Sequence, residues 1–256
     1  MKILVALKQV PARDSVLKID SAGRWLDESD LSFEINEPDA YALEAALQLR
    51  DQQGGEVVVL CAGPGRAVTS IREALAKGAD RALHIEEDAL GSYDSLSLGR
   101  LLAAAAAAEQ PDLILTGLQS DDLGSGQSGV VMAELMGLPH ATIIMAVEIT
   151  GSGLRVKREL EGGWFQHVSM PMPAVLTIQS GINKLRYATL MGIKKAKTKE
   201  IRKLSASELG VPSEQGAELL RVYAPQRTKQ TQMLTGTAAE QAGQLVEKLR
   251  FEVRAI

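Results

Sequence analysis

Residues 112–136, DLILTGLQSDDLGSGQSGVVMAELM, carry the pattern that decides the fold. The apolar run Asp112–Thr116 has the length of a buried strand. A polar, glycine-rich loop follows at Gly117–Gly129, and a helix is expected from about Val130 to Met136. A strand that leads through a short loop into a helix is the repeating half of a βαβ unit. This stretch therefore predicts an α/β protein rather than an all-β or all-α one.

The same alternation occurs three more times towards the N-terminus. Expected strands occupy 2–7 (KILVAL), 56–61 (EVVVLC) and 81–85, and expected helices occupy 39–50, 67–77 and 95–109. Glycines break the pattern where turns are needed, with Gly63-Pro64-Gly65 after one strand and Gly78 at one helix end. Right-handed crossovers between such strands produce a doubly wound, mainly parallel sheet with helices on both faces.

The pattern changes after Pro139. Four strand-like segments, 141–149, 154–160, 164–169 and 174–178, follow one another without helices between them. Glycine turns separate some of them, so we expect an antiparallel extension of the parallel core. Beyond Arg186 lies a basic stretch at 194–203, then a polar, proline-containing tail from Pro212 to Thr237 and a final amphipathic helix over Ala238–Arg250. We therefore divide the chain into an α/β domain with its antiparallel extension (1–185), a loop with a basic helix (186–203), and an extended C-terminal arm with the terminal helix (204–256).

The composition narrows the classes of function. The formal net charge is −4, which predicts no nucleic-acid partner. Cys61 is the single cysteine, so an internal disulfide is impossible and a cytoplasmic, reducing location is expected. The N-terminal apolar run ends at Lys8 and is interpreted as a buried strand rather than a signal peptide. No apolar run reaches 18 residues, so we expect no direct membrane insertion.

The loop before the last helix of the parallel core is the main candidate binding site. Ligands of doubly wound sheets lie beyond the carboxyl ends of the strands, and free amides at a helix N-terminus stabilise a phosphate. Gln127, Ser128, Gly129 and Val130 would face that phosphate. No lysine lies between Gln119 and Met136, which favours a monophosphate over a more highly charged group. The alternative is a flexible surface loop that merely ends a strand.

Two further turns are weaker candidates. CAGPG at 61–65 follows a strand and could pass its backbone along a nucleotide, but a plain βα turn explains it equally well. Asn36 precedes the first helix and could bond a ribose or a base edge. Asp39 is expected as the N-cap of that helix, and a capping role alone would explain the segment.

The sequence contains no catalytic constellation. Its three histidines are scattered, and no spacing suggests a metal site. Neither GxSxG nor GxxxxGK[ST] occurs. In RYATLMGIKKAKTK, at 186–199, Leu190 and Met191 are apolar and lysines follow them. An apolar anchor beside charges is a plausible docking site, and a solvated basic helix is the alternative.

Several segments together resemble the electron-transfer flavoprotein β subunits. They are KILVALKQVP, NEPDAYALEAALQL, REALAKGADRALHI, DLILTGLQSDD with GQSG, and RYATLMGIKKAK, in that order, and the resemblance covers roughly residues 1–210. It implies a heterodimer with an α subunit that holds most of an FAD, and a structural AMP in this subunit. The chain would then be an electron carrier subunit rather than a bond-making enzyme. Its electrons would come from flavin dehydrogenases that dock transiently, and would pass to a membrane quinone reductase or another acceptor.

The resemblance also implies roles for single residues. Ala6 matches the position whose backbone contacts adenine, Asn36 the asparagine before the first helix, and Ala62 a backbone contact in the second turn. The matches in the phosphate loop are Asp122, Gln127, Ser128 and Gly129. Leu190 matches the leucine of the recognition loop that anchors in a partner dehydrogenase, with Met191 beside it.

Two alternatives stay open at this point. In electron-bifurcating members of the family a second FAD replaces AMP, and such members commonly carry DGDTAQVG where this chain has DLGSGQSG. That difference weakens the second-FAD hypothesis. The other alternative is a stand-alone adenine-nucleotide-binding protein with the same sheet topology.

Overall fold

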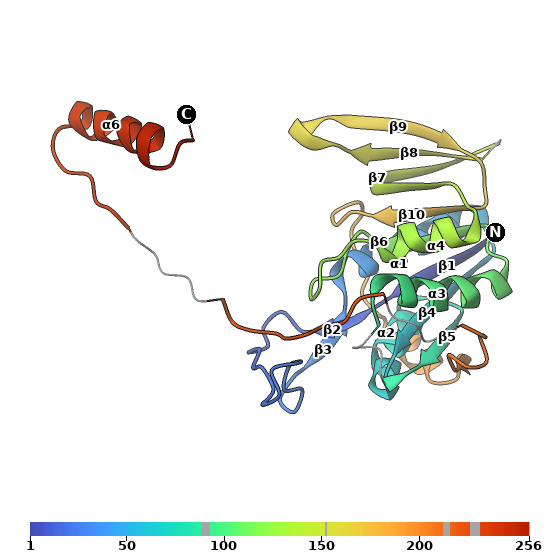
Figure 1. The fold of residues 1–256 in the computed structure, drawn as a ribbon. Helices are drawn as coiled ribbons and strands as arrows, with labels where there is room; N and C mark the ends of the chain where they lie inside the picture. The colour runs from blue at the N-terminus through green and yellow to red at the C-terminus, as the bar shows by residue number, and fades with distance from the viewer. Residues whose placement is uncertain (89–92, 152, 212–215, 226–230, 256) are drawn as a thin grey trace. The chain divides into compact units, whose positions relative to one another are not determined.

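The chain forms two separate compact units, Met1–Arg221 and Val222–Ile256. The computed structural model (Figure 1) describes residues 1–256 except 89–92, 152, 212–215, 226–230 and 256. The predicted polar tail from Pro212 to Thr237 therefore lies partly outside the described residues.

A mixed sheet is the centre of the larger unit. In the described residues its nine strands follow the order β11-β5-β4-β1-β6-β10-β7-β8-β9. The strands are β1 (Lys2–Leu7), β4 (Glu56–Gly63), β5 (Arg81–Glu86), β6 (Leu113–Gly117), β7 (His140–Thr150), β8 (Gly153–Glu159), β9 (Phe165–Met170), β10 (Ala174–Ile178) and β11 (Ile201–Leu204). All pairs from β11 to β7 are parallel, and β7–β8 and β8–β9 are antiparallel. The predicted doubly wound, mainly parallel sheet is confirmed.

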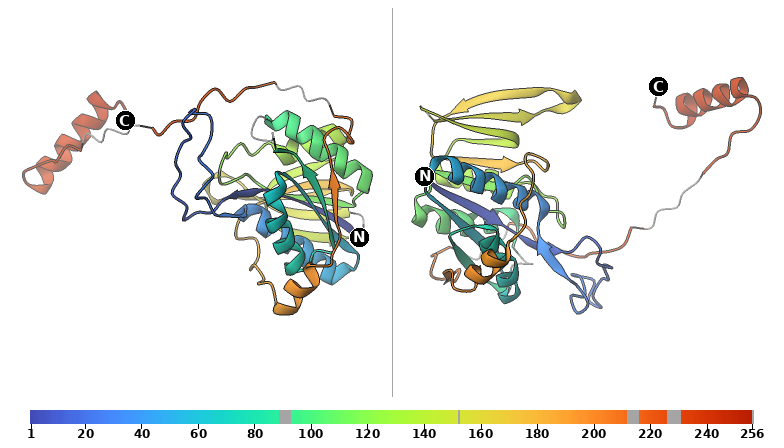
Figure 2. Two further views of the ribbon diagram at one scale, coloured as in Figure 1. Left: turned by 90° about the horizontal axis from the view of Figure 1, so that it is seen from below. Right: turned by 180° about the vertical axis from the view of Figure 1, so that it is seen from behind.

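Helices cover both faces of the parallel strands (Figure 2). They are α1 (Glu37–Gln53), α2 (Val68–Lys77), α3 (Ser95–Glu109) and α4 (Ser128–Met136), and a 3₁₀ turn, Gly65–Ala67, precedes α2. Because successive strand residues point to opposite faces, Ile3 and Val5 pack on the α1 and α2 side, whereas Leu4 packs on the α3 and α4 side. The apolar runs of the sequence are therefore strands buried on both faces.

One strand of the expected antiparallel extension lies elsewhere. Only β7, β8 and β9 form the extension, seen at the top of Figure 1, with a 3₁₀ turn at Glu161–Gly163 between β8 and β9. β10 (AVLTI) is buried along its whole length and runs parallel between β6 and β7. The expectation for 174–178 was wrong because a glycine turn does not show whether the next strand pairs beside it or crosses back into the core.

Three short elements complete the larger unit. Strands β2 (Gln9–Pro11) and β3 (Phe33–Ile35) pair at the base of a long excursion over residues 12–32. Helix α5 (Leu190–Ala196) is shorter than the basic stretch of sequence, because β11 begins at Ile201 and pairs with β5 at the sheet edge. The basic stretch is thus split between a helix and an edge strand.

The smaller unit contains one α-helix among its described residues. This helix, α6 (Ala238–Glu247), begins with a capping box in which Thr237 and Glu240 bond each other's backbone amides, and a π-helical turn, Lys248–Glu252, follows it. No described residue of the helix is buried. The amphipathic helix expected over Ala238–Arg250 is therefore present, but its apolar side is uncovered.

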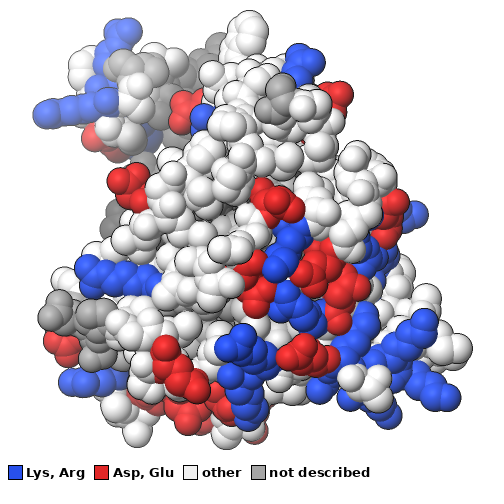
Figure 3. Space-filling view, turned by 90° about the vertical axis from the view of Figure 1, so that its right-hand side faces the viewer, with Lys and Arg blue, Asp and Glu red and all other residues white. Residues whose placement is uncertain are grey.

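On one face of the molecule (Figure 3), charges are mixed rather than segregated. Figure 3 shows a face on which basic and acidic side chains lie side by side. Ion pairs in the described part of the chain include Lys2–Glu56 at 3.6 Å and Arg81–Glu109 at 2.6 Å. Mixed charge of this kind produces no broad basic field.

Candidate functional site

A cavity of about 770 Å³ lies at the carboxyl ends of β1, β4 and β6. The chain crosses from β1 to β4 on one side and later places β6 on the other side of β1, so the strand order reverses here. Open α/β sheets bind ligands at this switch point. Seven predicted site residues line the cavity: Ala6, Asn36, Ala62, Asp122, Gln127, Ser128 and Gly129. Val130, also described, is not among the lining residues.

Asn36 holds the glycine-rich loop in place. Its side chain is almost fully buried, its Nδ2 donates to the carbonyl of Gln119 at 2.9 Å, and its Oδ1 accepts from the amide of Asp121 at 2.9 Å. Although Asn36 is the N-cap residue of α1, its side chain makes no capping hydrogen bond. Both polar atoms serve the loop, so the side chain shapes the cavity wall rather than offering free atoms to a ribose.

Asp39 is not the N-cap that the sequence predicted. It lies in the first turn of α1, is buried, and accepts hydrogen bonds from the amides of Lys8 at 2.7 Å and Gly117 at 2.8 Å. Burial raises its pKa to about 7, against the lowering effect of the Lys8 and Gly117 hydrogen bonds. The carboxyl group therefore ties together the ends of β1 and β6, the two strands that flank the switch point.

Gly117 is required by this arrangement. A Cβ at this position would lie 2.3 Å from Asp39 Oδ1 and 2.8 Å from its backbone nitrogen. Any side chain would therefore push α1 away from the end of β6.

Lys8 is a site residue that sequence reasoning missed. Its Nζ lies 2.6 Å from Asp122 Oδ1 and 3.4 Å from the Ser120 hydroxyl. Burial opposes ionisation of Asp122, but the Lys8 ammonium and hydrogen bonds from Lys8, Ser120 and Leu123 outweigh it, so the pKa of Asp122 lies below its usual range. Lys8 directly follows the first strand, so its place at this sheet edge could have been inferred from the strand ends.

The N-terminus of α4 closes the floor of the cavity. The first helical hydrogen bond runs from the Val131 amide to the Gln127 carbonyl at 2.9 Å, so the amides of Ser128, Gly129 and Val130 precede it. A Cβ on Gly129 would lie 2.6 Å from Thr116 Oγ1 and 2.7 Å from Thr177 Cγ2. Glycine therefore lets α4 approach the ends of β6 and β10, and the cavity-facing group at this position is backbone.

The opposite wall comes from the excursion at 12–32 and the turn after β4. Arg66 Nη2 contacts both carboxyl oxygens of Glu28 at 2.9 Å, and its guanidinium lies 4.0 Å from the centre of the Phe33 ring. All three residues line the cavity. The place of this excursion in the site was not predicted, because its residues follow no strand or helix pattern.

Comparison with known proteins connects this geometry to a family. The family model "Electron transfer flavoprotein domain" matches residues 24–209. The chain is 37% identical to the electron transfer flavoprotein subunit beta of Methylophilus methylotrophus, over 96% of this chain and 97% of the relative. The chain belongs to the electron transfer flavoprotein β-subunit family.

Other β-subunit relatives cover the whole chain. The Bacillus subtilis subunit and the mitochondrial subunit of Oryza sativa subsp. japonica are each 33% identical over 100% of both chains. The match therefore includes the excursion at 12–32 and the C-terminal unit as well as the sheet.

In this β-subunit family member the predicted docking residues are exposed at the surface. Leu190 is 88% exposed and Met191 is 61% exposed, at the start of α5. Thr189 caps the helix by accepting a 3.0 Å hydrogen bond from the Gly192 amide. The two apolar side chains therefore project from a capped helix end, and neither lines the cavity at the switch point.

Among the described residues, no helix is long and apolar enough to cross a membrane.

Proposed function

We propose that this chain is the β subunit of a heterodimeric electron-transfer flavoprotein that carries electrons from flavin dehydrogenases to a membrane quinone reductase or another acceptor. It holds a structural AMP, while an α subunit holds most of the FAD. The observation that carries the proposal is the cavity at the strand switch point, closed by the N-terminus of α4. Its volume of about 770 Å³ is in the range usual for small-molecule sites, about 300–1,000 Å³.

The ends of the strands suit the adenosine part of AMP. Ala6 and Ala62 line the cavity at the ends of β1 and β4, where small side chains leave the backbone accessible to a flat base. Gly63 and Gly65 continue this wall without bulky side chains. An adenine ring would lie against these backbones, with its phosphate directed to the first turn of α4.

The charge balance favours a monophosphate. Lys8 is neutralised by Asp122, and Arg66 is neutralised by Glu28. The N-terminus of α4 adds a positive potential equivalent to about half an elementary charge. Such a site stabilises one phosphate more readily than the pyrophosphate of a second FAD. This balance, with the loop sequence DLGSGQSG, supports AMP over the bifurcating alternative.

Three polar side chains in the cavity wall are already hydrogen-bonded or paired within the chain. Asp39 accepts two amides, Asn36 is bonded to the loop, and Asp122 is paired with Lys8. This arrangement supports a carrier subunit rather than a bond-making enzyme. Burial raises the pKa of the Cys61 thiol to about 12. We also propose a cytoplasmic location, which the presence of a single cysteine in the sequence favours.

The proposed α partner accounts for apolar surface that this chain leaves exposed. Leu245, Val246 and Phe251 are exposed on the terminal helix and the turn after it. Phe165, the first residue of the edge strand β9, and Trp164 just before it are also exposed. We propose that the arm, residues 204–256, contacts the α subunit, so that the chain expressed alone aggregates and recovers on co-expression. A monodisperse, nucleotide-saturated monomer would contradict this assembly.

Nucleotide content tests the proposal directly. The purified heterodimer is denatured, and the released flavin and AMP are counted per heterodimer. One FAD with one AMP is expected. Two FAD without AMP would support the bifurcating alternative, and a chain that purifies without any second subunit would support the stand-alone nucleotide-binding protein.

A second component of the proposal is docking through α5. Leu190 and Met191 form an exposed apolar knob, and Lys194 and Lys195 follow within the same helix. An apolar anchor with charges beside it suits a transient interface, because charges steer the encounter and the apolar group fills a pocket on the partner.

A further inference from the structure

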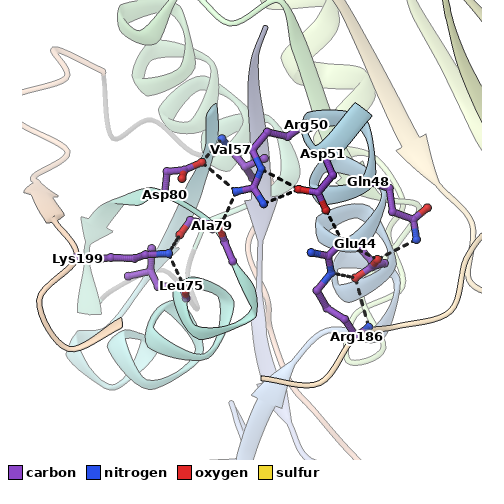
Figure 4. Close-up of polar contacts among 11 residues, drawn as sticks. Glu44, Gln48, Arg50, Asp51, Val57, Leu75, Ala79, Asp80, Arg186 and Lys199 are labelled. Carbon is purple, nitrogen blue, oxygen red and sulfur yellow. Dashed lines mark hydrogen bonds and ion pairs between the residues drawn. The ribbon is translucent and has the colours of Figure 1, made fainter. Parts of the chain in front are cut away.

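The segment that carries the exposed knob, Arg186–Lys199, is anchored at both of its ends. At the N-terminal end, Arg186 Nε lies 2.7 Å from Glu44 Oε2, and its Nη2 lies 3.1 Å from Glu44 Oε1 and 3.2 Å from Asp51 (Figure 4). The Glu44 side chain is only 5% exposed. A bidentate guanidinium–carboxylate pair of this kind is geometrically specific. It therefore fixes the position of the start of the segment against α1.

The C-terminal end of the segment is fixed by two cations, one on α2 and one just after α5. Each donates hydrogen bonds to carbonyls at the end of the other helix. Arg72, on α2, donates through Nη1 to the carbonyls of Ala196 and Lys199, at the end of α5. In return, Lys199 Nζ donates to the carbonyls of Leu75 and Ala79, at the end of α2 (Figure 4). The last carbonyls of a helix have no partners within it and carry partial negative charge, so cations stabilise them.

Close backbone contact locks the two helices together. A Cβ on Gly192 would lie 2.3 Å from the Ala76 carbonyl oxygen, so only glycine allows this approach of α5 to α2. The end of α2 is in turn tied to α1, because Arg50 Nη1 donates to the Gly78 carbonyl at 2.8 Å (Figure 4). Asp80, beside it, accepts from the Val57 amide of β4 at 2.8 Å. The support therefore extends from α5 to the sheet.

A cavity of about 670 Å³ lies between these elements and has basic residues in its wall. Three of the four basic residues in this wall are already engaged: Arg186 with Glu44, Lys77 with Glu73 at 2.8 Å, and Lys199 with two carbonyls. The fourth, Lys195, would be a single cation in the wall. The arrangement therefore argues for a structural clamp rather than for an anion-binding site.

We propose that Arg72, Arg186 and Lys199 are positioning residues for docking, which hold α5 in one orientation before the dehydrogenase arrives. The proposal rests on the docking function proposed above. Leu190, at 88% exposed, has almost no packing of its own to hold it, so its position depends on the anchors beneath it. Ordering a loop in advance removes that entropy cost from the binding step.

The test uses the purified heterodimer and a flavin dehydrogenase chosen because it reduces the wild-type protein. Arg72→Met should raise the KM for the heterodimer about threefold to tenfold, the size expected when one side chain must be ordered on binding. The kcat and the FAD and AMP contents should stay unchanged. Arg72→Lys should restore the KM, because a single nitrogen makes both carbonyl contacts. Lys77→Met, on the same helix, is the control for loss of one positive charge.

Hydrogen exchange in the absence of dehydrogenase measures the anchoring independently. Amides of 187–196 should exchange on the order of tenfold faster in Arg72→Met, with unchanged exchange in the sheet. The double variant Glu44→Leu/Arg186→Leu tests the other anchor without leaving a buried charge unpaired.

Leu190→Ala, run in parallel, separates the two proposals. A raised KM in Leu190→Ala with wild-type values for both KM and exchange in Arg72→Met would overturn the positioning role alone. A wild-type KM in Leu190→Ala would overturn the docking function, and the positioning role with it.

Discussion

Asn36 Oδ1 accepts a 2.9 Å hydrogen bond from the backbone amide of Asp121, 85 residues further along the chain. The same side chain donates to the Gln119 carbonyl, so one buried side-chain amide is hydrogen-bonded to the loop backbone at two positions. The start of α1 thus determines the shape of the loop that leads to α4. Nucleotide binding should therefore depend on residues that never touch the phosphate.

Asn36→Asp should weaken AMP binding without unfolding the sheet. The substitution keeps the acceptor for Asp121 but places a carboxylate oxygen against the Gln119 carbonyl in place of a donor. Losing one buried hydrogen bond with the partner left unsatisfied costs about 1–3 kcal/mol, which corresponds to roughly fivefold to 150-fold in affinity if the whole cost falls on the bound state. AMP retained per heterodimer after dialysis measures this. Full AMP occupancy after dialysis, at the wild-type dissociation rate, would mean that the loop holds its shape without Asn36.

The fold was largely predictable from the sequence, because strands that are buried on both faces occur in the sequence as continuous apolar runs. Lys2–Leu7 and Ser95–Glu109 were predicted with the bounds that the structure has. The parallel pairing of Ala174–Ile178 with β6 was not predicted, since strand order depends on contacts between segments far apart in the chain. Asp39 was misassigned for a similar reason: its partners, Lys8 and Gly117, come from two separate strand ends.

The candidate site was predicted in part. Residues on the loop before α4 could be named, because a glycine-rich loop between a strand and a helix has a known use. Arg66 and Glu28 could not, since 38 residues separate them and neither belongs to a motif. Residues that support a site through long-range pairs become visible only when the chain is folded.

Lys8→Met should weaken AMP binding more than the loss of one distant charge would. Lys8 neutralises Asp122, whose side chain is only 15% exposed, so its removal leaves a negative charge near the proposed phosphate. The expected loss of affinity is on the order of tenfold, which corresponds to about 1.4 kcal/mol. Titration of the heterodimer with AMP after removal of bound nucleotide measures it. The double variant Lys8→Met/Asp122→Asn should recover part of the loss, and no recovery would contradict the repulsion argument.

Asp39→Asn should destabilise the protein by an amount that depends on pH. The carboxyl group of Asp39 accepts hydrogen bonds from two backbone N–H groups. In the Asn variant the side-chain NH2, itself a donor, would face one of these N–H groups, and the lost hydrogen bond costs about 1–3 kcal/mol. The pKa of Asp39 in the folded protein is about 7, above its ordinary value of 3.8, so the folded state binds more protons between these values. The stability contributed by wild-type Asp39 is therefore fully present below about pH 4 and is lost as the pH rises through 7.

Urea unfolding of the heterodimer at pH 5 and pH 8 checks this sign. The difference between wild type and Asp39→Asn should be larger at pH 5 than at pH 8. An equal difference at the two pH values would show that the pKa of Asp39 is not raised in the folded protein.

Gly129→Ala should lower AMP binding by moving the N-terminus of α4. The added Cβ would lie 2.6 Å from Thr116 Oγ1 and 2.7 Å from Thr177 Cγ2, too close for any real contact. Overpacking of this kind typically costs about 1–3 kcal/mol. Gly129→Ala/Thr177→Ser removes one of the two clashing groups and should recover part of the binding. Melting temperature and AMP content, measured together, test the effect, and wild-type values for both would show that α4 can shift freely.

Leu190→Ala should impair electron transfer from a flavin dehydrogenase while FAD and AMP contents stay at wild-type levels. Leu190 is 88% exposed at the start of a capped helix, lies outside the cavity at the switch point, and so contributes little to folding or nucleotide binding. Truncating an apolar anchor at an interface commonly costs about 2 kcal/mol or more, which predicts a rise in KM of roughly thirtyfold. Leu135→Ala, at an exposed leucine on α4, is the matched control for losing a surface leucine. Steady-state reduction of the heterodimer by the dehydrogenase measures both variants. The same KM in Leu190→Ala, Leu135→Ala and wild type would show that the dehydrogenase docks elsewhere on the heterodimer.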